Sequence, residues 1–112
     1  MHRHNVEGEP PTQLLSILRM ASGASLWRGL DYVEQVRVKN LRPVGKGAFD
    51  AEVEGSANLP YTVHVDTAHV RQSYCDCPHV AGTRRICKHM VATVFAAYPQ
   101  QIGAFKWEVE QA

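Results

Sequence analysis

The hydrophobic and polar positions alternate through much of the middle of the chain, which is typical of β-strands with one solvated face. The alternation is carried by residues 36–39, 49–54 and 61–66, and a shorter stretch follows through residues 70–74. Turn-forming residues separate these stretches, and the first break is expected from Asn40 onward, where proline and glycine follow. The pattern predicts an antiparallel meander of three to four strands.

On both sides of this region the hydrophobic positions recur at helical spacing instead. Residues 12–23 predict a first helix, with a threonine as its cap and a glycine at its end. A second helix is predicted to begin near Ser22 or Ser25. A third stripe of apolar positions covers residues 87–98 and is ended by Pro99, which cannot continue a helix.

The two ends of the chain complete the expected organisation. Residues 1–11 are polar and rich in proline and histidine, and they are expected to form a disordered lead. At the other end, Phe105, Trp107 and Val109 alternate with charged residues, which predicts a short strand or a docked tail. The expected fold class is therefore α+β, with N-terminal helices, the meander and a C-terminal helix in a single domain over residues 12–112.

Composition narrows the range of functions. The 112 residues carry a formal net charge of +1, so no strong overall field attracts the chain to nucleic acid or to an anionic membrane. The apolar runs fall short of the roughly 20 residues that span a bilayer, and no signal-peptide core precedes them. A cytoplasmic location is expected, and in a reducing compartment clustered cysteines are more often metal ligands or catalytic groups than disulfides.

The candidate chemistry is concentrated in one short segment that holds all three cysteines. Cys75 and Cys77 are two residues apart, and Cys87 and His89 repeat that spacing after a nine-residue loop over residues 78–86. Positions i and i+2 of a strand face the same side, so the first pair can aim both sulfurs at one point. The second pair is expected at the start of a helix. Three thiolates and one imidazole form a tetrahedral structural zinc site.

Other interpretations of the segment are weaker. Ordinary core cysteines would not cluster in two such pairs, and a disulfide between Cys75 and Cys77 would close a strained ring. A catalytic thiol would need a base, but the nearby histidines are better explained as ligands. The fourth ligand has one alternative, His79, although Pro78 should turn it away from the face of the strand. Iron could occupy a site of this kind in a heterologous host.

The pattern Cys75-x-Cys77, a loop, and Cys87-x-His89 leading into an apolar helix resembles the SWIM-type zinc finger. This family occurs with bacterial SNF2-type helicases and plant MuDR-type transposases. Upstream, residues 25–32 resemble the serine, arginine-glycine and tyrosine segment that precedes many bacterial SWIM fingers. The resemblance implies a compact ββα zinc module with its core at residues 61–98, and a role in binding DNA or proteins.

The predicted zinc is structural, because four ligands leave no open position for substrate or water. No enzyme activity and no small-molecule substrate are therefore expected. Candidate contacts to nucleic acid or to a partner are the basic residues in and beside the loop: Arg71, Arg84, Arg85 and Lys88. Another basic residue, Arg28, is expected to tie its helix to a carboxylate or to a strand carbonyl.

Two binding functions remain open at this point. The basic residues can contact phosphates, which would give weak, salt-sensitive and sequence-indifferent binding to DNA. The alternative is an interaction module or accessory subunit of a helicase-like assembly that binds only protein, with the loop and Trp107 as docking points. The nearly neutral charge favours the second function slightly, and the resemblance favours the first.

Overall fold

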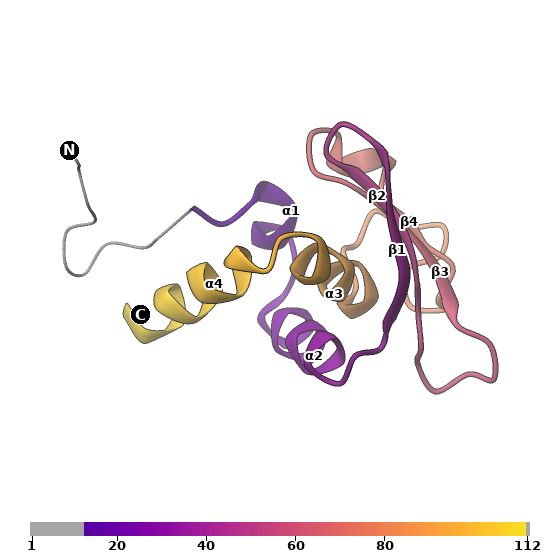
Figure 1. Ribbon diagram of the computed structural model, residues 1–112, viewed down its shortest axis with the longest axis horizontal. Helices are drawn as coiled ribbons and strands as arrows, with labels where there is room; N and C mark the ends of the chain where they lie inside the picture. The colour runs from indigo at the N-terminus through magenta and orange to yellow at the C-terminus, as the bar shows by residue number, and fades with distance from the viewer. Residues whose placement is uncertain (1–12, 112) are drawn as a thin grey trace.

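The computed structural model describes residues 13–111, so the predicted lead over residues 1–11 lies outside the described residues. Four antiparallel strands form one sheet in the order β1-β2-β3-β4, and the helices gather on one side of it (Figure 1). The predicted α+β class and the predicted meander are both confirmed.

The strands follow the alternation of the sequence closely. Their bounds are β1 Val38–Gly45, β2 Ala48–Val53, β3 Tyr61–Asp66 and β4 Tyr74–Cys75. The central pair is regular, with Ala51 opposite Val63 and Phe49 opposite Val65. Ala51, Val63 and Val65 are fully buried, so the inner face of the sheet is the apolar face that the period of two predicts.

The predicted loop from Asn40 onward is wrong, because β1 continues through this region to Gly45. Its pairing with β2 shifts between Lys39 and Arg42 and again between Pro43 and Gly45. Asn40 adopts a left-handed conformation, with φ of 54°, at the first of these irregularities. Bulges at the edge of a sheet accommodate proline and left-handed residues that a central strand would exclude.

Four α-helices surround the core: α1 Ser16–Arg19, α2 Gly23–Glu34, α3 Lys88–Ala97 and α4 Gln100–Gln111. The start of α2 is as predicted, because the Ser22 side chain accepts a hydrogen bond of 3.1 Å from the Ser25 amide. The first helix is much shorter than the predicted residues 12–23. The buried side chain of Gln101, on α4, accepts a hydrogen bond from the Leu15 amide and donates one to the Gln13 carbonyl. The backbone of residues 13–15 is therefore bonded to α4, and α1 begins only after it.

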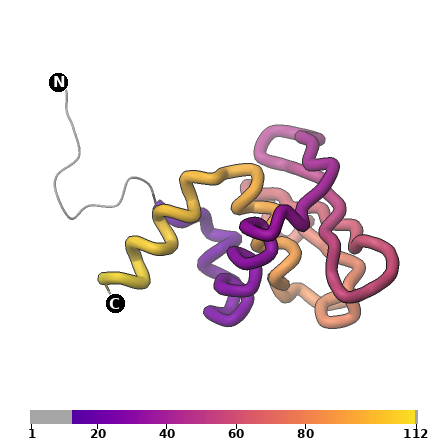
Figure 2. Tube along the Cα trace, turned by 60° about the horizontal axis from the view of Figure 1, so that its bottom comes forward, coloured from indigo at the N-terminus to yellow at the C-terminus, as the bar shows by residue number. Residues whose placement is uncertain are grey.

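The C-terminal segment is a helix and not the predicted strand or docked tail. Gln101, Ala104 and Phe105 are buried at the spacing of one helical face. Three alternating apolar residues are too few to distinguish the two periods, and the intervening lysine and glutamates favour helix. The helix extends away from the sheet, as the yellow end of the tube shows (Figure 2).

Helix α3 is the centre of the core, packed against α2 on one side and against β1, β2 and β3 on the other. Residues 89–95 are all buried, which explains why this helix is apolar on nearly every side. The close approach of α2 depends on Gly29. A Cβ atom there would lie 2.4 Å from Val91 Cγ1 and 3.0 Å from the Lys88 carbonyl oxygen.

Gly29→Ala is expected to lower the free energy of unfolding by about 1–3 kcal/mol, because the two helices must separate to admit the methyl group. Gly103→Ala is the matched control, since nothing lies within 4 Å of its Cβ position on α4. That change should be neutral or stabilising by about 0.5–1 kcal/mol. Denaturant unfolding of the zinc-loaded protein measures both variants, and equal stabilities would contradict the packing described here.

Candidate metal centre

The first pair of cysteines lies where β4 ends and a turn begins. Cys75 is the last residue of β4, so Cys77 lies outside the strand that was predicted to hold both. The chain nevertheless stays beside β3 as far as Asp76, whose carboxylate accepts from the Thr62 amide at 2.9 Å. The Cys77 carbonyl then accepts from the Ala81 amide at 3.0 Å and closes the turn. Side-chain and backbone bonds replace the predicted strand geometry.

The second pair lies as the sequence predicts. Cys87 is the N-cap residue of α3, with extended backbone angles, and His89 is the second residue of the helix. The buried side chain of Ile86 anchors the end of the loop immediately before them. The loop therefore returns the chain to the sheet at the point where the core helix begins.

The four side chains converge on one point. The Sγ atoms of Cys75, Cys77 and Cys87 and a ring nitrogen of His89 all lie within 4.8 Å of one another, and all four residues are buried. His89 Nδ1 is 3.7 Å from the Sγ atoms of both Cys75 and Cys87. In a tetrahedral zinc site, bond lengths of about 2.3 Å to sulfur and 2.0–2.1 Å to nitrogen separate these atoms by about 3.5 Å. The cluster fits one structural zinc ion.

The ring of His89 is held between two tyrosines. Its centroid lies 5.5 Å from the Tyr32 ring and 4.6 Å from the Tyr61 ring. Gly55 leaves room for this arrangement, since a Cβ there would lie 2.7 Å from Tyr61 Cε2. Nε2 is buried and has no hydrogen-bond partner in the described part of the chain. Nδ1 faces the sulfurs, so it is the nitrogen that is placed to bind a metal.

The thiols are strongly coupled to one another. The hydrogen bond from Cys75 lowers the pKa of Cys87 to about 4, with a further contribution from His89. The same hydrogen bond and burial raise the pKa of Cys75. The two shifts have opposite directions because the two sulfurs share one proton between them in the metal-free cluster. A cation that replaces this proton is bound by thiolates in a site with little water.

The other predicted residues lie around this centre. Arg84 and Arg85 are exposed on the finger loop, residues 78–86, and Lys88 is half-buried with its Nζ atom 5.4 Å from the Tyr32 ring centroid. Arg71 is exposed in the short 3₁₀ helix Val70–Gln72. Arg85 and Lys88 line one cavity beside the metal centre, whereas Arg71 and Arg84 are not among its lining residues.

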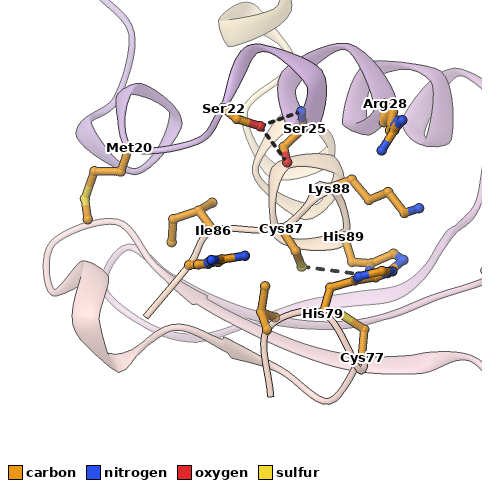
Figure 3. A pocket seen from close by; sticks show the side chains of 12 residues that line it. Met20, Ser22, Ser25, Arg28, Cys77, His79, Ile86, Cys87, Lys88 and His89 are labelled. Carbon is orange, nitrogen blue, oxygen red and sulfur yellow. Dashed lines mark hydrogen bonds between the residues drawn. The ribbon is translucent and has the colours of Figure 1, made fainter. Parts of the chain in front are cut away.

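His79, the alternative fourth ligand, lies outside the cluster of four ligand atoms. It is exposed and lines the same cavity as Arg85 and Lys88 (Figure 3). His64, in the sheet, instead contacts Asp50 Oδ1 through Nδ1 at 2.6 Å. The geometry therefore brings His89 and none of the other described histidines to the three sulfurs.

Sequence reasoning missed the contribution of α2 to this site. Arg28 lines the cavity with Ser25. It has no hydrogen bond to a strand carbonyl, so that predicted tie is wrong, and no carboxylate within residues 13–111 pairs with it. Tyr32, on the same helix face, covers His89. All three belong to the upstream segment that resembles the region before SWIM fingers, and their spacing of three to four residues is the signal that could have grouped them.

Comparison with known families agrees with this geometry. Residues 61–98 match the family model of the SWIM zinc finger. This segment is a SWIM zinc finger. The match covers β3, β4, the finger loop and α3, while α2 and the first two strands of the sheet lie outside it. No curated protein and no solved structure matches the chain. Within residues 13–111, no helix combines the length and apolar character that a membrane crossing requires.

The SWIM finger geometry predicts different outcomes for its two candidate histidines. His89→Ala should weaken zinc retention by at least about tenfold, because the ring nitrogen nearest the sulfurs is lost. His79→Ala should leave one zinc per chain, because His79 is exposed and lies outside the cluster. Metal content after dialysis against a chelator, measured by mass spectrometry, compares the two variants with wild type. Equal zinc retention in the His89 variant would contradict the assignment.

Proposed function

We propose that the protein is a zinc-stabilised, non-catalytic binding module in which Cys75, Cys77, Cys87 and Nδ1 of His89 hold one zinc ion. The four buried ligand atoms support this proposal, since together they fill a tetrahedral coordination shell. A catalytic zinc keeps a position open for water or substrate. Zinc here has a structural role, because it joins the end of β4 to the start of α3.

The bound zinc ion gives the finger loop its shape. It fastens the end of β4 to the N-cap of α3, and the free energy of zinc binding is on the order of 10 kcal/mol in comparable structural fingers. Within the loop, Thr83 Oγ1 donates to the Val80 carbonyl and accepts from the Arg85 amide. These bonds, like the backbone bonds of the turn, stay within the loop and its preceding cysteine. The buried side chains of Val80 and Ile86 and the zinc ion therefore attach the loop to the rest of the fold and present its arginines.

Nucleic acid is the ligand that the charges around the finger support best. The carrying observation is that Arg28, Arg85 and Lys88 line one cavity without an ion pair within residues 13–111. Among the other described cations, Arg19, Arg42 and Lys106 have acidic partners, which are Glu108, Glu52 and Glu34. Other basic residues also have no ion pair within residues 13–111, but they do not line this cavity, so the gathering of three cations at one site is what sets Arg28, Arg85 and Lys88 apart. Unpaired cations beside a rigid loop are suited to phosphates, with binding that is weak, salt-sensitive and indifferent to sequence.

The proposed function also concerns the extent of the domain and its location in the cell. We place residues 12–112 in one domain that acts in the cytoplasm, where a reducing environment keeps the three thiols available to zinc. A single zinc per chain then suffices, because the three cysteines all belong to one cluster.

A protein partner in a helicase-like assembly is the second candidate function. Met20 and Trp27 support it, since they expose 56% and 47% of their surface close to the start of α2. Trp27 also packs edge-on against Phe105, so its ring is held in place for contact. The other tryptophan, Trp107, is one of the two docking points that the sequence predicts, together with the finger loop, and it is partly buried.

Binding to single- or double-stranded DNA should weaken steeply as salt rises, and reversing the charges of Arg84 and Arg85 to glutamate should abolish it. Two or three neutralised phosphates correspond to a loss of affinity of roughly 10- to 40-fold for double-stranded DNA, and about 7- to 20-fold for single-stranded DNA, between 50 and 200 mM salt. Fluorescence anisotropy with labelled DNA measures both effects.

The matched control reverses Lys39 and Lys46, two exposed cations on β1 and the turn that follows it that have no ion pair within residues 13–111, and should leave DNA affinity nearly unchanged. Absence of measurable affinity at low salt for the zinc-loaded wild type would refute DNA binding and leave the protein-partner function.

A further inference from the structure

A cavity of about 410 Å³ opens beside the metal centre, between α2, the finger loop and the first turn of α3 (Figure 3). Cys77, Cys87 and His89 contribute to its wall on the side of the metal cluster. Opposite them, the N-terminal part of α2 contributes the polar groups of Ser22, Ser25 and Arg28. The cavity is thus shared between the SWIM finger and a helix that precedes it.

All the charged side chains that line this cavity are basic. Arg28, Arg85 and Lys88 contribute three positive charges, and no carboxylate from the described residues lines it. Hydroxyl donors are present as well. Ser22 Oγ donates to Ser25 Oγ at 3.1 Å, which leaves the hydroxyl proton of Ser25 without an acceptor in the described part of the chain (Figure 3). Cationic side chains and hydroxyl donors are both groups that bind phosphate oxygens in proteins.

The charge of the site matches one particular phosphate species. Zinc with three thiolates carries a charge of about −1, so the three cations leave about +2 at the cavity. A phosphate monoester carries about −1.5 to −2 at neutral pH, whereas a phosphodiester within a nucleic-acid backbone carries about −1. A concave site with a charge of about +2 is better matched to a terminal phosphate monoester than to a phosphodiester in the middle of a strand.

We propose that this cavity binds the terminal phosphate of a nucleic-acid strand, with Arg28, Arg85 and Lys88 neutralising its charge and Ser25 donating a hydrogen bond. The inference rests on the proposed nucleic-acid function and adds the strand end as the feature recognised. Arg84 is exposed next to Arg85 but outside the cavity, where it can contact the following backbone phosphate. Among the described residues no phenylalanine, tyrosine or tryptophan lines the cavity, so the terminal base is not stacked there.

The test compares two forms of one internally labelled single strand, with either a 5′-phosphate or a 5′-hydroxyl. In anisotropy titrations of the zinc-loaded full chain, the phosphorylated strand should bind roughly tenfold tighter. Arg28→Gln should remove this preference, because it lowers the affinity for the phosphorylated strand more than the affinity for the hydroxyl strand. Lys46→Gln is the matched control, because it removes one charge from the turn between β1 and β2 and should keep the preference.

A second measurement keeps the test independent of any one variant. Inorganic phosphate should displace the phosphorylated strand from the wild-type protein at concentrations that leave the hydroxyl strand bound. Unchanged zinc content and an unchanged amide spectrum away from the cavity confirm that Arg28→Gln is folded.

The outcomes separate this inference from the proposed function. Equal binding of both strands would overturn terminal-phosphate recognition and leave nucleic-acid binding intact. A preference that persists in Arg28→Gln would overturn the assignment to this cavity. Failure of both strands to bind would refute the nucleic-acid function and this inference with it. Binding of a phosphoserine peptide, with no binding of either strand, would assign the cavity to a phosphorylated protein instead.

Discussion

The structure depends on two short segments that bring four ligand atoms to one point. Cys75 and Cys77 come from the edge of the sheet, and Cys87 and His89 come from the start of the core helix. Because α3 is the helix around which the other elements pack, a metal bound at its N-cap connects the sheet edge directly to the core. The finger loop between the two pairs then has both ends fixed, although its own hydrogen bonds are all local.

Helix α2 extends the functional unit beyond the SWIM finger itself. Gly29 lets this helix approach α3 closely, and Tyr32 then reaches the ring of His89. Arg28 and Ser25, one and two turns before Tyr32, form the far wall of the basic cavity. One helix face therefore covers the metal ligand, packs against the core and lines the basic cavity, although it lies outside the segment matched to the family.

The sequence was sufficient for features that depend on local chemistry. Two ligand pairs with a one-residue spacing predicted the cluster, and alternation of apolar residues predicted the central strands. Features that depend on tertiary context were not predictable in the same way. The extension of β1 past Asn40 relies on an edge position with bulges, and α4 was hidden by a short alternation around Trp107. The position of Arg28 in the cavity wall depends on the packing of α2 beside the finger loop, which no local pattern in the sequence encodes.

The most direct test of the account is amide hydrogen exchange with and without zinc. If the metal ties β4 to α3, chelation should raise exchange over residues 74–89 and leave the central strands β2 and β3 protected. Unchanged protection across residues 74–89 after the metal has been removed would contradict the account, because the loop would then keep its conformation without zinc.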